Sequence, residues 1–254
     1  MRMTVLEMVQ DILSEMDSDE VNSIDDTIEA GQVATILKNT YFLMCSNRNW
    51  GDEKKMITLD HIGRIKLPTH MKIPNNIKQL DYLAYDCTKD DGVHAKSDYR
   101  TLKYKHPDEF LRMCQYRPQT QDENWTEIKD LGGVTLFVRN NTAPTYWTSF
   151  DDNHIICDSY DKAVDTTLKA SKTQAMVVVS AEWKYSDDFI PKLPIEAYAA
   201  LLADAKSTAF SSLKQMENAK AEMNAQKQQR WLARKNSTTM GGVRYQTFGR
   251  RSAK

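Results

Sequence analysis

The chain has 254 residues and a mass of 29.2 kDa, which is enough for a substantial hydrophobic core in one large domain or two small ones. Hydrophobic residues make up 41%, charged residues 27% and the formal net charge is -1, which excludes a wholly disordered chain and a polycation that coats nucleic acid. Because the four cysteines are widely spaced, no apolar run approaches about 18 residues and no signal-peptide pattern opens the chain, we expect a soluble protein without disulfides.

The first segment, residues 1–52, predicts a pair of helices. Apolar side chains at helical spacing indicate a first helix over about residues 4–16. After a polar break, Asp26 and Glu29 have the spacing of a capping box, which would start a second helix that ends before Trp50. We expect the two helices to pack as an antiparallel pair.

The middle segment, residues 53–190, has the pattern of an antiparallel sheet, because short runs of β-branched and aromatic residues alternate with turn formers. A short helix is expected after Pro107, over residues 108–116. Tight hairpin turns are expected at the Asp-Asp-Asn run of 151–153 and at the glycine pair of 132–133. The expected strands are residues 55–60, 77–86, 99–104, 127–129, 134–139, 146–150, 154–157 and 176–181.

One long helix is expected within residues 191–235, because Pro194 suits a first helical turn and no Gly or Pro follows until Gly241. At about 1.5 Å per residue it would extend roughly 60 Å, beyond a compact domain of about 45 Å, so we expect it to overhang its own domain. Residues 236–254 would follow as an extended basic arm. The predicted fold class is therefore α+β: a bundle of the N-terminal helix pair and the long C-terminal helix, with a β-rich antiparallel insertion and a C-terminal arm.

Charge is distributed unevenly along the chain. Residues 1–30 contain nine acidic residues and one basic residue, whereas residues 223–254 contain eight basic residues and no acidic one. The opposite signs indicate contacts between copies or with a partner, although a solvated helix face and a disordered tail would also explain them. Trp231 lies among the C-terminal cations, the pattern of an interface hot spot. Packing of Trp231 onto its own bundle, or stacking on nucleic acid with Tyr245 and Phe248, are the alternatives.

No pattern in the sequence predicts a catalytic or metal-binding site. The glycines never form a phosphate-binding loop, and the five histidines lack the spacing of a zinc site. Asp151, Asp152 and His154 resemble an acid/base cluster, but a hairpin turn explains these residue types. We therefore expect no enzymatic activity, no catalytic or metal-binding residues and no cofactor. The alternative is an enzyme with an unrecognised site in the β-rich segment.

Three stretches carry a family resemblance: the end of the second helix with Asn47-Arg-Asn-Trp50, the segment Thr145-Tyr-Trp-Thr-Ser-Phe-Asp-Asp152, and residues 214–251. Together with the acidic helical start, the β-rich insertion and the basic end, the chain resembles the head-to-tail adaptor family of short-tailed bacteriophages, often called tail tubular protein A-like. The resemblance extends over nearly the whole chain and rests on this arrangement. The β-rich insertion is large for a minimal adaptor of that family, which leaves its contacts open.

The resemblance implies a structural virion protein, assembled in the host cytoplasm and located in the neck of the virion. Copies, commonly twelve, would form a ring between the capsid portal and the tail nozzle, through which DNA passes without sequence-specific binding, and no membrane is involved. Asp17, Asp19 and Glu20 are candidates for lining the channel, where their charge would repel DNA. The alternatives are another neck or nozzle component and a nucleic-acid-binding module that uses the basic tail. The residues that the resemblance assigns to portal docking are Trp231, Leu232, Arg234, Lys235, Arg244, Tyr245, Phe248, Arg250 and Arg251.

Overall fold

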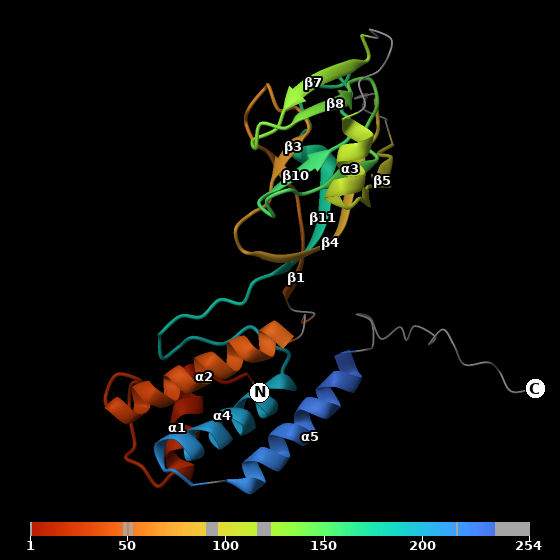
Figure 1. Cartoon of the computed structure of the whole chain (residues 1–254). Helices are drawn as coiled ribbons and strands as arrows, with labels where there is room; N and C mark the ends of the chain where they lie inside the picture. Colours follow the sequence, from red (N-terminus) through yellow and green to blue (C-terminus); the bar gives the residue numbers. More distant parts are fainter. Residues whose placement is uncertain are drawn as a thin grey trace, which may run out of the picture. The chain divides into compact units, whose positions relative to one another are not determined.

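The computed structural model is a mixed α+β protein with five α-helices and several antiparallel sheets in the part of the chain that it describes (Figure 1). It divides into two compact units, which we call the helical unit (residues 1–53 and 181–254) and the β-rich unit (residues 54–180). The boundaries expected from the sequence lie after residues 52 and 190. The described residues are 2–47, 50, 53–89, 96–115, 123–216 and 218–236, with the backbone alone for 233–236.

The first helix, α1, spans Val5–Glu15 and begins with a capping box. The Thr4 hydroxyl accepts a hydrogen bond from the Glu7 amide N–H at 3.2 Å, and the Glu7 carboxylate accepts one from the Thr4 N–H at 2.9 Å. These two bonds satisfy N–H groups that have no partner within the helix. The prediction of a helix at the N-terminus is therefore confirmed.

The second helix, α2, spans Ile28–Asn47, but its predicted cap is wrong. The Thr27 hydroxyl accepts the hydrogen bond from the Ala30 N–H at 3.1 Å, which is the capping position that we assigned to Asp26. The Asp26 carboxylate instead accepts hydrogen bonds from the N–H groups of Asn22 and Ser23, at 2.7 and 2.8 Å. The turn before the helix presents two N–H groups to one carboxylate, and that arrangement competes with the capping box.

Two helices replace the single long helix predicted in residues 191–235: α4 spans Ala197–Leu213 and α5 spans Ala219–Asn236. The chain turns at Gln215, whose φ is 53°, and the Asn218 side-chain oxygen accepts a hydrogen bond from the Ala221 N–H at 3.0 Å at the start of α5. The prediction was wrong because it relied on Gly and Pro as helix breakers, whereas a left-handed residue and an Asn cap break this helix.

The helical unit has one hydrophobic core, to which all four of its described helices contribute. The helix α4 contacts α1, α2 and α5, and the core includes Leu37 and Tyr41 of α2, Leu201 of α4 and Leu232 of α5. Because α5 folds back and packs against α4, the predicted overhang is also wrong. The last described helix finds its apolar partner within its own unit.

The β-rich unit contains three sheets in its described part. One sheet has the strand order β1-β11-β4-β5, the second has the order β2-β3-β10-β9-β6, and β7 and β8 form a hairpin. The strands are β1 (Lys54–Ile57), β2 (Asp60–His61), β3 (His70–Lys72), β4 (Ile77–Asp86), β5 (Tyr99–Thr101), β6 (Lys103–Tyr104), β7 (Trp125–Lys129), β8 (Thr135–Arg139), β9 (Tyr146–Thr148), β10 (His154–Cys157) and β11 (Thr173–Val179).

The predicted strands of this unit differ from the observed ones in several places. The strand expected over residues 55–60 is divided into β1 and β2, which belong to different sheets. The strand expected over residues 99–104 is divided into β5 and β6, which belong to different sheets. The short strand β3 was not predicted, because three residues carry little periodicity. The pair β6 and β9 is parallel, whereas the other strand pairs of the described residues are antiparallel.

Both predicted hairpin turns are confirmed. Asp152 lies between β9 and β10 with a φ of 57°, and Gly133 lies between β7 and β8 with a φ of 79°. The predicted short helix is present as α3, Pro107–Cys114, which contacts β8 and β9 and buries Phe110 in the core. The four cysteines of the chain are free thiols, and three of them are buried.

Candidate partner-binding surface

The helix α5 has two different sides. Its inner side is made of Ala221, Ala225 and Leu232, which are at most 6% exposed. Its outer side carries two large apolar residues, Met223 and Trp231, which are 72% and 46% exposed. Large exposed apolar side chains on the same side of a helix are typical of a binding surface.

Two cations lie between these apolar residues. Lys227 and Arg230 follow Met223 at helical spacings of four and seven residues, so the four side chains share one side of the helix, which we call the α5 stripe (Met223, Lys227, Arg230 and Trp231). Lys227 and Arg230 are exposed and form no ion pair or hydrogen bond with the described residues. The stripe lines a shallow hollow along the helix. Arginine and tryptophan beside exposed apolar surface favour binding to an acidic protein surface.

The predicted docking residues have different positions in the structure. Trp231 is half-exposed on the α5 stripe, but its neighbour Leu232 is 3% exposed and belongs to the core, so its assignment as a surface docking residue is wrong. Successive residues of a helix point about 100° apart, which explains why adjacent residues differ. The side chains of Arg234, Lys235, Arg244, Tyr245, Phe248, Arg250 and Arg251 lie outside the described residues.

The acidic N-terminal segment is partly neutralised within the helical unit. The Lys206 ammonium of α4 lies 2.8 Å from an oxygen of Asp11 and 2.5 Å from an oxygen of Glu15. Burial alone would lower the pKa of Lys206, but the two carboxylates raise it overall. Lys214 lies 3.3 Å from Glu29. These ion pairs join α4 and its C-cap residue to α1 and α2, and they could not be predicted from the sequence because they connect residues far apart in the chain.

Asp17, Asp19 and Glu20 remain exposed after α1, and we call them the acidic corner. Their carboxylates form no hydrogen bond or ion pair with the described residues. Asp17 has a φ of 53°, which is the left-handed conformation that ends α1. The helical unit therefore carries two exposed surfaces of opposite charge, the acidic corner and the α5 stripe.

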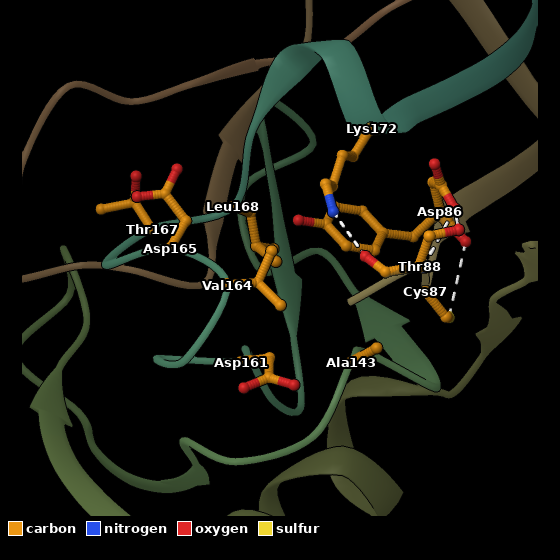
Figure 2. A pocket seen from close by; sticks show the side chains of 11 residues that line it. Asp86, Cys87, Thr88, Ala143, Asp161, Val164, Asp165, Thr167, Leu168 and Lys172 are labelled. Carbon is orange, nitrogen blue, oxygen red and sulfur yellow. Dashed lines mark hydrogen bonds between the residues drawn. The ribbon is translucent and has the colours of Figure 1, made fainter. Parts of the chain in front are cut away.

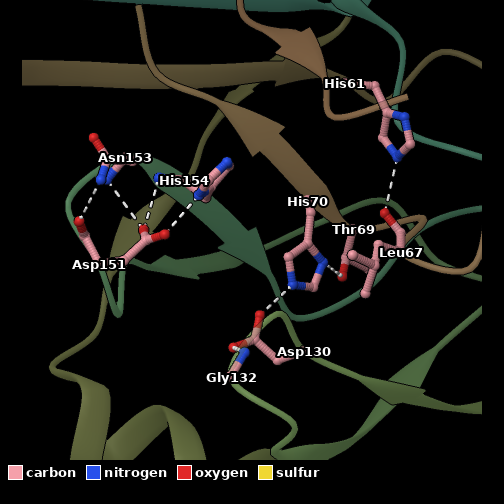
Figure 3. Close-up of polar contacts among 9 residues, drawn as sticks. All are labelled: His61, Leu67, Thr69, His70, Asp130, Gly132, Asp151, Asn153 and His154. Atoms are coloured by element: carbon pink, nitrogen blue, oxygen red, sulfur yellow. Dashed lines mark hydrogen bonds and ion pairs between the residues drawn. The ribbon is translucent and has the colours of Figure 1, made fainter. Parts of the chain in front are cut away.

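The candidate acid/base cluster in the β-rich unit has a structural role. The Asp151 carboxylate accepts hydrogen bonds from the N–H groups of Asn153 and His154, and it lies 2.6 Å from Nδ1 of His154 (Figure 3). Partial burial alone would raise the pKa of Asp151, but the hydrogen bonds from His154 and Asn153 lower it overall. The carboxylate holds the β9–β10 turn, as the sequence predicts for an Asp at this position.

A second histidine contact was not predicted. His70 of β3 is fully buried, and its Nε2 lies 2.7 Å from an oxygen of Asp130 in the turn after β7 (Figure 3). Its Nδ1 lies 3.3 Å from the Thr69 hydroxyl, and the other Asp130 oxygen accepts a hydrogen bond from the Gly132 N–H. Burial lowers the pKa of His70 despite the neighbouring carboxylate. The contact joins β3 to the β7–β8 hairpin.

The buried imidazole predicts a pH dependence of stability. Below its ordinary pKa of 6.5, His70 gains a proton in the unfolded chain but stays neutral in the folded one, because its pKa in the folded state is lowered. The β-rich unit should therefore lose stability as the pH falls from 6.5 toward the pKa that His70 has in the folded state. Urea unfolding at several pH values should show this decrease in the natural chain and much less of it in His70→Gln. The exposed His106 provides the control, since His106→Gln should keep the decrease. An equal pH dependence in His70→Gln would contradict the assignment.

A third polar cluster surrounds Lys172 at the ends of β4 and β11 (Figure 2). The Lys172 ammonium, on a residue only 9% exposed, donates a hydrogen bond to the Thr88 carbonyl at 2.7 Å. Asp86 accepts hydrogen bonds from the hydroxyl and the N–H of Thr88. The cavity beside these residues has a volume of about 10 Å³, which is room for about one water molecule. The cluster therefore holds the chain locally and offers no space for a substrate.

The described residues contain no group of three or more His, Cys, Asp or Glu placed to hold a metal ion. None of the helices within the described ranges has both the length and the apolar character required to cross a membrane. Comparison of the chain with models of known protein families gave no match, and neither did comparison with curated protein sequences.

Proposed function

We propose that the chain is the subunit of a head-to-tail adaptor ring that joins the capsid portal of a short-tailed bacteriophage to its tail and forms part of the DNA channel. The observation that carries this proposal is the α5 stripe, in which two cations and two apolar side chains are exposed on the last described helix. The stripe leads directly into the basic end of the chain. The order of acidic helices, β-rich insertion and basic end agrees with the same family.

In this proposal the portal protein binds the α5 stripe together with Arg234, Lys235 and the basic residues that follow. An exposed tryptophan supplies apolar contact area, and the flanking cations supply attraction to an acidic surface. Many copies act together in a ring, so moderate binding by each copy gives tight attachment of the whole assembly. The subunit contributes no chemistry, and its role is mechanical.

The four helices of the helical unit would form the wall of the ring in this proposal. Contacts between identical subunits must then be head-to-tail contacts that close by rotation, as in other cyclic assemblies. The acidic corner would face the channel. Three unpartnered carboxylates per subunit, repeated around the ring, would repel phosphate groups and keep passing DNA from binding to the wall.

Electron microscopy of the purified chain, alone and with the portal protein of the same virus, tests the proposal. We expect rings that form only, or more readily, when the portal is present, because the portal brings the copies together. In a map of that complex, the α5 stripe should lie against the portal and the acidic corner should face the channel. Particles that remain monomers with and without the portal would overturn the proposal.

A second function, nucleic-acid binding, is favoured by the same stripe. Lys227 and Arg230 would contact phosphate groups, and Trp231 would stack on a base. Such binding would weaken steeply as the salt concentration rises, because each phosphate contact releases counterions. Binding of the portal should survive moderate salt. Tight, steeply salt-dependent binding of DNA in the absence of portal binding would favour this second function.

A further inference from the structure

The β-rich unit contains a cavity of about 290 Å³ beside α3 and the β7–β8 hairpin. Aromatic side chains of Trp125, Phe137 and Tyr146 line it, together with the carboxylate of Asp158 and the guanidinium of Arg139. Its volume is at the lower end of the roughly 300–1,000 Å³ of small-molecule pockets, which suits a ligand with one ring. Neither the histidine contacts nor the Lys172 cluster shares these residues.

The carboxylate of Asp158 is fixed in place. One of its oxygens accepts hydrogen bonds from the N–H groups of Thr145 and Tyr146, each at 2.9 Å. Burial raises the pKa of Asp158 in spite of these bonds. No Lys, Arg or His of the described residues forms an ion pair with this carboxylate. The cavity therefore presents a rigid acceptor group on a partly apolar wall.

Two cations already lie on the aromatic rings. The guanidinium carbon of Arg139 is 5.2 Å from the centre of the Trp125 ring, and the Lys105 ammonium is 4.7 Å from the centre of the Tyr146 ring. The charged side chains that line the cavity itself are one guanidinium, of Arg139, and one carboxylate, of Asp158. Because these two charges balance, the cavity favours a neutral ligand.

Hydroxyl groups suit this combination of partners. A hydroxyl donates a hydrogen bond to a carboxylate and accepts one from a guanidinium, and both bonds are strengthened by the charge of the protein group. The side chains of Thr142, Thr145 and Ser159 add further hydroxyl groups to the lining. A sugar ring has hydroxyls on its edge and C–H groups on its faces, so its faces can pack against aromatic side chains.

We propose that this cavity binds one neutral, hydroxyl-rich six-membered ring, the chemistry of a free monosaccharide or of the terminal sugar of a glycan. The ring packs against Phe137 and against the sides of Trp125 and Tyr146 that the two cations leave uncovered, and its hydroxyls bond to Asp158 and Arg139. This site is independent of the α5 stripe and of the adaptor function. It gives the large β-rich unit a binding role of its own.

Saturation-transfer NMR of the full chain with a panel of monosaccharides at millimolar concentration tests the proposal. We expect transfer to at least one sugar, with the strongest signals from the protons on the ring face that packs against the aromatic side chains. A second arm uses trisaccharides that end in the same sugar. Tighter binding of the trisaccharide indicates a glycan as the natural source, and tighter binding of the free sugar indicates a small metabolite; either result supports the site.

Two variants localise the binding. Arg139→Gln and Asp158→Asn should each weaken sugar binding by about 10-fold, because each removes a charged hydrogen-bonding partner. Asp158→Asn keeps an oxygen that can accept the two backbone hydrogen bonds, so the fold should be retained. Arg100→Gln is the matched control, since Arg100 is exposed in the same unit and pairs with Asp98 outside the cavity. The control should bind the sugar as the natural chain does.

The competing ligand classes are tested in the same way with putrescine as the cation, citrate as the anion and uridine as a planar base. Binding of one of these probes that is lost in Arg139→Gln, without binding of any sugar, would overturn the proposal. The absence of saturation transfer from the folded chain to any of the sugars would overturn it as well. Sugar binding that is unchanged in both Arg139→Gln and Asp158→Asn would also overturn the proposal, because the sugar would then bind elsewhere.

Discussion

Replacement of both Lys227 and Arg230 by Glu should abolish binding of the chain to the portal protein. The double variant reverses the charge of the α5 stripe while leaving Met223 and Trp231 in place. Each substitution turns an attraction to an acidic partner surface into a repulsion, and we expect the affinity to fall by at least ~100-fold. Neither cation has a partner among the described residues, so the free energy of unfolding should change by no more than about 0.5 kcal/mol. Surface plasmon resonance on immobilised portal and thermal unfolding measure the two quantities.

The matched control is Arg64→Glu with Lys66→Glu in the β-rich unit. These two residues are exposed and close in sequence, and their replacement changes the net charge of the chain by the same amount. Because net charge alone affects association, the control separates this general effect from a local one. The control should bind the portal as the natural chain does. Equal portal binding by the natural chain and the Lys227/Arg230 variant would show that the stripe is not the docking surface.

Helices and turns were predicted correctly from the sequence where residues close together in the chain determine the local structure. The apolar spacing over residues 4–16 predicted α1, and the structure shows that this helix begins with a capping box of Thr4 and Glu7. The Asp-rich turn before His154 and the glycine pair after Asp130 predicted two hairpins. In each case the side chain and the backbone group that it bonds are within a few residues of each other, so the sequence contains the whole interaction.

Contacts between residues far apart in the chain could not be predicted from sequence patterns. His70 and Asp130 are separated by 60 positions, and the parallel pairing of β6 with β9 joins Lys103 to Tyr146, which are 43 positions apart. The Lys206 ion pairs with Asp11 and Glu15 connect opposite ends of the chain. The residue types alone do not reveal these pairs, because many carboxylates compete for each cation in a chain with 35 acidic residues.

The α5 stripe was predicted only in part from the sequence. Trp231 was assigned to docking from the sequence because it lies among cations. Met223, Lys227 and Arg230 were not, because only the helix geometry places them on the same side as Trp231. The break before α5 was missed, although Asn218 three residues before Ala221 is the pattern of an N-cap. Recognition of that cap would have predicted a separate helix whose small residues Ala221 and Ala225 face inward with Leu232. The inner and outer sides of α5 would then have been distinguished without the structure.

Truncation of the adjacent residues Trp231 and Leu232 should affect different properties, namely portal binding for Trp231 and the free energy of unfolding for Leu232. Leu232→Ala removes a side chain that is 3% exposed in the core of the helical unit, and we expect it to lower the free energy of unfolding by about 2–4 kcal/mol. Trp231 is 46% exposed, so Trp231→Ala should lower it by only about 1 kcal/mol or less, yet weaken portal binding by at least ~30-fold. Urea unfolding measures the first effect, and portal binding by the folded variants measures the second.

Leu43→Ala is the matched control for the leucine, because Leu43 of α2 is 56% exposed and its truncation should cost less than about 0.5 kcal/mol. A large loss of stability in Leu232→Ala alone would establish that α5 is held by its own unit, as the structure has it. If Leu232→Ala were instead as stable as Leu43→Ala, α5 would be detached from α4 in solution. The helix would then be free to extend toward a partner, and the surface proposed to bind the portal would include its inner side as well.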